Sequence, residues 1–270
     1  MTAANSNSPI DAVLEASPLA RFARYMDATE ETDGWFNAES AALWDALLGW
    51  QTTRRIKGHM LEIGVWHGKS AALMAMHADA DRTCMLVDIK IHRARIESAL
   101  ERLGLRDSIE VSCLQCNSRE LVTDPLITEG FRGFRWIHID GEHTGGAVSS
   151  DLAIAANLLA DGGVVVIDDF FSWLYPQITE AVLRYLRSYP DDFSMFLCGY
   201  NKAYLARPHF VHEYMELCAG SLCDELEQRG IEPTLSRTTY PAEMNTFGIG
   251  NRFQGARLRG PDWEPGVIRY

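Results

Sequence analysis

Residues 62–70 read Glu-Ile-Gly-Val-Trp-His-Gly-Lys-Ser, and this stretch decides how the chain is interpreted. An apolar, strand-like run at residues 59–63 leads into it, and a run rich in Ala, Leu and Met at residues 69–80 follows with helical spacing. Gly64 and Gly68 therefore mark a tight turn between a strand and a helix. Many α/β proteins hold a nucleotide at such a turn.

The details of this turn argue against two classes of nucleotide. A phosphate loop of the Walker type needs four residues between its glycines, whereas Gly64 and Gly68 enclose three, and Glu62 would repel a triphosphate. Trp66 stands where a dinucleotide fingerprint needs a glycine beside the pyrophosphate. S-adenosylmethionine (SAM) carries no phosphate, and its cationic groups favour a nearby carboxylate. The turn therefore favours SAM.

Strands and helices alternate from residue 59 to residue 187, which predicts an α/β fold with a doubly wound, mostly parallel sheet. Two further apolar runs flank Tyr200-Asn201 and predict a C-terminal antiparallel hairpin. Seven strands are expected, at residues 59–63, 84–89, 108–113, 134–139, 164–167, 193–199 and 202–206. We divide the chain into an N-terminal helical appendage (1–57), a SAM-binding core (58–207) and a C-terminal helix and tail (208–270).

The composition limits the possible partners. The 25 Lys and Arg against 37 Asp and Glu give a net charge of −12, which disfavours nucleic acid as a partner. Met1 to Pro9 lacks the pattern of a secretory signal, and no apolar run is long enough to span a membrane. The lone Cys113-x-x-Cys116 favours buried free thiols over a zinc or redox site. These features predict a cytoplasmic protein, and they leave small molecules or a protein as its partner.

Polar residues stand at the carboxyl end of nearly every expected strand. Ligands of doubly wound sheets bind at that edge. Asp88 ends the second strand and can accept hydrogen bonds from both ribose hydroxyls of SAM. The other polar strand ends are Asn117, Asp140 and the pair Asp168-Asp169.

The three aspartates predict a metal site. Two adjacent carboxylates at a sheet end repel each other unless a cation or a proton compensates them. With Asp140, the pair Asp168-Asp169 offers three hard oxygen ligands suited to Mg²⁺ or another divalent cation, which would lower the pKa of a bound hydroxyl. His143 can reach the same space as a general base. Capping or turn roles for the aspartates, and a structural role for His143, are the alternatives.

With these motifs, residues 58–207 resemble the class I SAM-dependent methyltransferases. Within that class they are similar to the metal-dependent O-methyltransferases of the catechol and macrocin (antibiotic sugar) types. The matching loop form is E-x-G-x-x-x-G-x-S with a central aromatic residue, formed here by Glu62, Gly64, Trp66, Gly68 and Ser70.

The resemblance implies a role for each motif. The backbone of residues 64–68, together with Ser70, would hold the amino-acid end of SAM. Asp88 would bind the ribose, and Asn117 and Ser118 would line the adenine. Asp140, Asp168 and Asp169 fall on the metal positions, and His143 replaces the catalytic lysine of the catechol type, as the antibiotic-tailoring type does.

The acceptor is the least determined part of the interpretation. The aromatic loop Phe170 to Tyr175 would suit a flat or glycosidic acceptor, and core packing is its alternative. We expect methyl transfer to a hydroxyl of a secondary metabolite, a sugar or a phenol, by a homo-oligomer. Three alternatives remain: a hydroxylase-pathway component, a metal-independent N-methyltransferase of the same fold, and a non-catalytic SAM-binding subunit.

Overall fold

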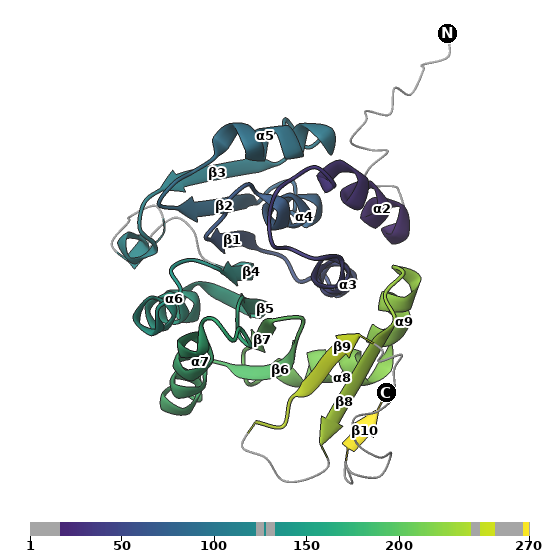
Figure 1. The fold of residues 1–270 in the computed structure, drawn as a ribbon, viewed down its shortest axis with the longest axis vertical. Helices are drawn as coiled ribbons and strands as arrows, with labels where there is room; N and C mark the ends of the chain where they lie inside the picture. The colour runs from purple at the N-terminus through teal and green to yellow at the C-terminus, as the bar shows by residue number, and fades with distance from the viewer. Residues whose placement is uncertain (1–16, 123–126, 128–132, 239–243, 252–266, 270) are drawn as a thin grey trace.

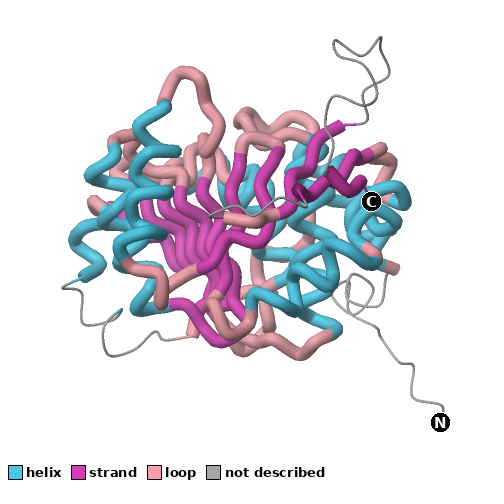
Figure 2. The backbone as a smooth tube through the Cα atoms, turned by 90° about the horizontal axis from the view of Figure 1, so that it is seen from below, coloured by secondary structure: helices cyan, strands magenta, loops and turns pink. Residues whose placement is uncertain are grey.

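The computed structural model describes residues 17–122, 127, 133–238, 244–251 and 267–269. A twisted sheet runs through the molecule, and helices cover both of its faces (Figures 1 and 2). The segment Met1 to Pro9 and most of the tail after residue 251 lie outside the described residues. Within them, no helix is both long and apolar enough to cross a membrane.

The described strands form one sheet in the order β3-β2-β1-β4-β5-β7-β6-β9-β8-β10. The first five strands in this order pair in parallel, whereas β7 is antiparallel to both of its neighbours, β5 and β6. This confirms the doubly wound sheet with a terminal hairpin. The strands are β1 (His59–Ile63), β2 (Thr83–Asp88), β3 (Glu110–Gln115), β4 (Phe134–Ile139), β5 (Leu159–Ile167), β6 (Ser194–Gly199), β7 (Lys202–Ala206), β8 (Pro233–Thr238), β9 (Phe247–Asn251) and β10 (Val267–Arg269).

Strands β8, β9 and β10 extend the sheet beyond the seven expected strands. They come from a region where the sequence shows no clear period, because β9 alternates Gly with its apolar residues and β8 begins at a proline. The parallel pairing of β9 with β6 holds this extension on the sheet. The strand expected at residues 164–167 begins earlier, because β5 also includes residues 159–163, where the pairing with β4 shifts register.

Two apolar layers sandwich the sheet. Side chains alternate along β1, so that Met60 faces one layer and Leu61 the other. Helices α6 (Gly145–Leu158) and α7 (Pro176–Ser188) cover the face of Leu61, together with the short 3-10 helix η1 (Ser118–Val122). The face of Met60 is covered by α2 (Pro18–Thr29), α3 (Ala38–Thr53), α4 (Lys69–His77), α5 (Arg93–Arg102), α8 (Val211–Gly220) and α9 (Leu222–Gln228).

A buried ion cluster ties three of these helices together. Asp45 of α3 accepts a hydrogen bond from Arg229 Nε at 2.7 Å, and its other oxygen lies 2.7 Å from His77 Nε2 of α4. Burial favours the neutral acid, but His77 and Arg229 hold the pKa of Asp45 below its usual range. Because Arg229 directly follows α9, the cluster joins the regions before and after the predicted core. The boundaries of that core at residues 57/58 and 207/208 stay predictions.

We expect Asp45→Ala to lower the free energy of unfolding by about 3–5 kcal/mol, because the buried guanidinium of Arg229 keeps only the half-exposed Glu225 as a partner and the buried His77 loses its hydrogen-bond partner. Urea unfolding followed by circular dichroism measures the change. The control is Glu213→Ala, which removes the partner of the half-exposed Arg54 and should cost less than about 1 kcal/mol. Equal shifts for the two variants would show that the cluster does not stabilise the fold, and Asp45→Asn replaces Asp45→Ala if the latter does not fold.

Candidate functional site

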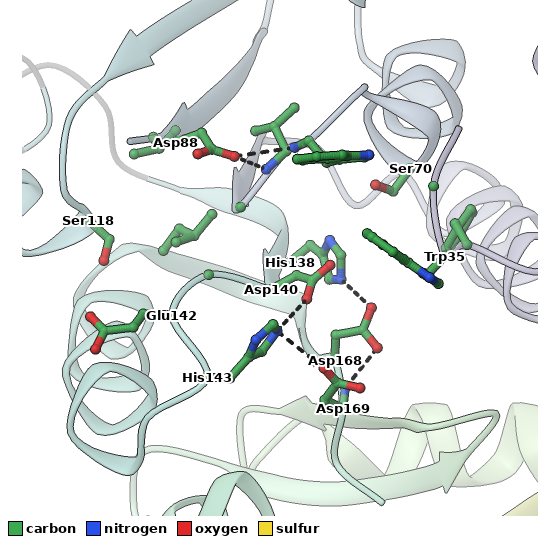
Figure 3. Close-up of a pocket in the computed structure, with 18 of the residues that line it drawn as sticks. Trp35, Ser70, Asp88, Ser118, His138, Asp140, Glu142, His143, Asp168 and Asp169 are labelled. Atoms are coloured by element: carbon green, nitrogen blue, oxygen red, sulfur yellow. Dashed lines mark hydrogen bonds and ion pairs between the residues drawn. The ribbon is translucent and has the colours of Figure 1, made fainter. Parts of the chain in front are cut away.

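A cavity of about 800 Å³ opens at the carboxyl ends of β1, β2, β4 and β5 (Figure 3). It lies between the loop after β1, the loop joining α2 to α3, and the loop after β5. Of the twelve residues predicted for the site, Glu62 and Gly68 are buried behind this lining. The other ten all line the cavity: Gly64, Trp66, Ser70, Asp88, Asn117, Ser118, Asp140, His143, Asp168 and Asp169.

Gly64 lets the loop after β1 pass against the end of β4. Its φ is +85°, and a Cβ at this position would lie 1.9 Å from the backbone oxygen of Asp140. No side chain fits there, so the glycine is a steric requirement of the crossing. The close approach also brings Asp140 to the cavity edge beside the loop.

Asp88 braces the loop from the neighbouring strand. Its Oδ2 accepts hydrogen bonds from the N–H groups of Val65 (2.8 Å) and Trp66 (3.2 Å), and its Oδ1 accepts one from the N–H of Lys90 (2.9 Å). A carboxylate offers about four acceptor positions, so roughly one is left for a ligand. Asp88 can therefore take one ribose hydroxyl directly, rather than both.

Glu62 lies beneath the loop and organises it from below. Its Oε1 accepts a hydrogen bond from Ser70 Oγ at 2.5 Å and lies 2.8 Å from His138 Nδ1. Its Oε2 is buried without a hydrogen-bond partner among the described residues. An unpartnered buried carboxylate oxygen is costly, and a cationic ligand group nearby would compensate it. This feature fits SAM, whose amino-acid end carries an ammonium group.

Both carboxylate oxygens of Asp168 interact with other groups of the protein. Its Oδ1 accepts the N–H of Asp169 at 2.7 Å, and its Oδ2 pairs with the buried ammonium of Lys202 and lies 3.5 Å from His138 Nε2. Burial alone would raise the pKa of Asp168, but Lys202 and His138 hold it well below its usual range. Asp168 is therefore a charged, fixed anchor.

His143 lies between the two other aspartates (Figure 3). Its Nε2 is 3.2 Å from Asp169 Oδ2 and 3.7 Å from Asp140 Oδ1. The interaction with the Asp140 carboxylate raises the pKa of His143, against a smaller opposing effect of burial. Burial, followed by the charge of Asp168, raises the pKa of Asp140 to about 6. The imidazole ring stacks on Tyr175, with 4.3 Å between centroids, and this contact fixes its plane.

The three aspartates meet at one site, but they do not form a single ligand set. Among the described residues, one group that could hold a metal ion is His138, Asp140 and Asp168, and the other is Asp140, His143 and Asp169. The ligand atoms of each group lie within 4.8 Å of one another. Carboxylates and imidazoles suit a divalent cation in kind. Lys202 and His138 already provide positive charge beside Asp168, and they would repel a cation bound there.

The sequence interpretation missed His138, Lys202 and Asn201. His138 is buried in β4, and hydrogen bonds with Asp168 and Glu62 outweigh desolvation and raise its pKa to about 9. Asn201 donates a hydrogen bond to Asp169 Oδ1 at 2.7 Å. The available signal was weak: one of the two polar residues, Arg135 and His138, in the otherwise apolar run of β4, and a lysine at the start of the apolar run of β7.

Aromatic side chains surround the mouth of the cavity. Trp35, in the loop between α2 and α3, is 90% exposed, and its ring centroid lies 6.0 Å from that of Trp66. The aromatic loop was predicted either to contact the acceptor or to pack in the core. Phe170 is buried in the core, whereas Leu174 and Tyr175 line the cavity. All six cysteines are free thiols.

Residues 61–170 match a protein family described as a methyltransferase domain. The match begins in β1 and ends just after the Asp168-Asp169 pair, so it contains the glycine loop, Asp88, Asp140 and His143. No curated protein sequence gives a significant match to the chain.

Solved structures with a similar fold share little sequence with the chain. A structural-genomics protein of Corynebacterium glutamicum is 14% identical, with a TM-score of 0.51 over 73% of this chain and 93% of that one. The O-methyltransferase TomG of Streptomyces achromogenes, involved in tomaymycin synthesis, is 20% identical, with a TM-score of 0.49 over 72% and 90% of the two chains. CalS11, a TDP-rhamnose O-methyltransferase of calicheamicin biosynthesis, is 16% identical, with a TM-score of 0.48 over 75% and 88%.

We expect Asp88→Ala to weaken SAM binding by about 10- to 100-fold, because the loop loses the acceptor of three N–H groups and the ligand loses a carboxylate. Isothermal titration calorimetry with SAM measures the affinity. The control is Asp81→Ala, which removes an exposed carboxylate outside the cavity. Unchanged affinity in Asp88→Ala, with the fold intact by circular dichroism, would contradict the assigned role.

Proposed function

We propose that this chain, a class I SAM-dependent methyltransferase by its domain match and fold, methylates a hydroxyl group of a small molecule. The observation that carries the proposal is His143, which faces the cavity between Asp140 and Asp169, at the strand edge that also holds the glycine loop. A titratable base at the end of a cofactor-sized cavity suits removal of a hydroxyl proton. SAM, when bound, supplies an electrophilic methyl group.

The residues around His143 support its action as a base. In its neutral form, the Nε2 lone pair would accept the hydroxyl proton as the acceptor oxygen bonds to the methyl carbon, while the methyl carbon–sulfur bond breaks and its electron pair leaves with the sulfur as S-adenosylhomocysteine. Asp140 and Asp169 then stabilise the imidazolium that forms, because both carboxylates lie within 4 Å of Nε2. Tyr175 holds the ring plane, so the nitrogen stays directed at the same point.

The proposal includes a divalent cation, Mg²⁺ by preference, held by Asp140 together with Asp168 or Asp169, its partners in the two candidate ligand groups. Such a cation would lower the pKa of the acceptor hydroxyl. The support is the chemistry of the donor atoms, which are hard oxygens at one edge of the sheet. One observation favours the rival, metal-independent transfer: Lys202 and His138 already neutralise Asp168 from within the protein.

The acceptor is proposed to be a sugar or phenol of secondary metabolism. The cavity of about 800 Å³ exceeds the volume of two ligand sites of the smallest usual size, since single sites occupy roughly 300–1,000 Å³, and this supports a small acceptor beside the cofactor. The aromatic side chains at its mouth would cover a flat ring by stacking.

We expect His143→Ala to lower kcat about 100-fold or more while the affinity for SAM changes little, because a general base contributes about 10²–10⁴ to the rate. Formation of S-adenosylhomocysteine (SAH), measured over a panel of phenols and sugars, gives the rate. His212→Ala removes an exposed histidine of α8 and should leave kcat unchanged. Undiminished turnover in His143→Ala would refute the assignment of the base.

Removal of metal tests the second half of the proposal. We expect EDTA to abolish turnover and added Mg²⁺ to restore it, because three carboxylates would otherwise crowd the acceptor oxygen. Full turnover in EDTA would establish metal-independent transfer, with Lys202 and His138 as the resident cations.

A further inference from the structure

The side chains that line the cavity carry mostly negative charge. Among the described residues that line it are six carboxylates, one lysine (Lys69) and the buried His138, whose pKa is raised to about 9, with no arginine. Lys202 lies close by but is buried and paired with Asp168. The six acidic residues are Asp33, Asp88, Asp140, Glu142, Asp168 and Asp169.

Two of these carboxylates, Asp33 and Glu142, are not assigned to cofactor binding or catalysis. Asp33, in the loop between α2 and α3, has a side chain that is 74% exposed at the cavity mouth, and its nearest partner is His67 Nδ1 at 3.5 Å. Glu142 follows β4, is 55% exposed, and lies 3.9 Å from Arg119. Neither is neutralised as Asp168 is. Both therefore add negative potential where an acceptor enters.

Such a wall discriminates by charge. A phosphate or carboxylate on the acceptor would need cationic partners inside the cavity, and recognition of these groups normally uses Arg or Lys. At the entrance, the exposed carboxylates of Asp33 and Glu142 repel such a ligand. A neutral acceptor is tolerated, and a cationic one is attracted toward Asp33 and Glu142.

The walls also favour a flat ring. Trp35 and Trp66 form one side of the mouth, and Tyr175, stacked on His143, forms another wall beside the base. Trp35 has few neighbours, so its large apolar face is available to a ligand. Aromatic faces also attract cations.

We propose that the acceptor is a flat phenolic ring without negative charge, that a ring bearing an ammonium group is preferred, and that Asp33 selects for this charge. Nucleotide sugars and aromatic acids are excluded as efficient acceptors. This inference rests on the proposed function, because it places the acceptor hydroxyl at His143.

The test uses three catechols that differ chiefly in side-chain charge: dopamine (cation), hydroxytyrosol (neutral) and dihydroxyphenylacetate (anion). A thymidine-diphosphate sugar is the fourth probe. SAH formation gives kcat/KM, and calorimetry on the SAH-loaded protein gives the affinity for each probe. We expect dopamine to exceed dihydroxyphenylacetate by about 10-fold or more in both measurements, with hydroxytyrosol between them.

Asp33→Asn should reduce the dopamine-to-dihydroxyphenylacetate ratio by about 3-fold, the scale of one exposed charge. The matched control is Glu31→Gln, which removes the same charge two residues away, outside the cavity lining, and should leave the ratio unchanged. A ratio that responds equally to both variants would refute the role of Asp33.

The remaining outcomes separate this inference from the proposed function. Preferred turnover of the nucleotide sugar or of dihydroxyphenylacetate would uphold O-methylation and overturn the charge selection. Binding in the expected order without turnover of any probe would uphold the charge selection and count against O-methylation. No binding of any catechol would overturn the inference.

Discussion

Four neighbouring strands place a line of buried charge beneath the cavity, and the rest of the site depends on it. In sheet order these charges alternate: Lys202 from β7, Asp168 at the end of β5, His138 in β4, and Glu62 in β1. Because the pKa of His138 is raised to about 9, the line is neutral overall at physiological pH. Removing any one member would leave a buried charge without its partner, which costs several kcal/mol. The loop above Glu62 and the acidic edge beside Asp168 are therefore parts of one electrostatic unit.

The N-terminal helices close this unit from above. The ring of Trp44 in α3 packs edge-on against His138, with 4.6 Å between centroids, and Lys202 Nζ lies 5.6 Å from the ring centre of Phe36. The hydroxyl of Tyr25 in α2 donates to the backbone oxygen of Lys69, at the start of the helix after the glycine loop. By excluding water, these aromatic residues strengthen the interactions they cover. A segment that the sequence presents as an appendage thus completes the polar core of the site.

The cofactor end of the site could be predicted because it is local in sequence. Gly64, Asp88 and Asp140 each stand at a strand end, and alternation of strands and helices suffices to bring strand ends to one edge. His138 and Lys202 could not be found this way, because their roles depend on which strands lie next to each other. The three added strands were missed because β9 has glycines where a regular strand would show its alternation. The proposed acceptor end combines Asp33 and Trp35 with the distant Tyr175, and these residues share no sequence pattern.

The hairpin between β6 and β7 gives the adjacent residues Asp168 and Asp169 different partners. Its two-residue turn, Tyr200-Asn201, has positive φ at both positions, as the tight turn of a twisted hairpin requires. The antiparallel register pairs Ile167 with Ala203. The residues that follow Ile167 therefore lie opposite the residues that precede Ala203. Asp168 therefore meets Lys202, and Asp169 meets Asn201. The first aspartate receives a charge and becomes an anchor; the second receives a neutral amide and keeps an oxygen near His143.

The turn of this hairpin also affects the backbone conformation of Asp169. Asp169 itself has a φ of +54°, an unfavourable conformation for a residue with a side chain, and the N–H of the following Phe170 donates to the backbone oxygen of Asn201 at 2.9 Å. The hairpin thus holds Asp169 in the conformation that turns its carboxylate toward the cavity. A hairpin one residue longer or shorter would move both pairings at once. The antiparallel strands that distinguish this fold therefore also assign separate roles to two identical neighbouring side chains.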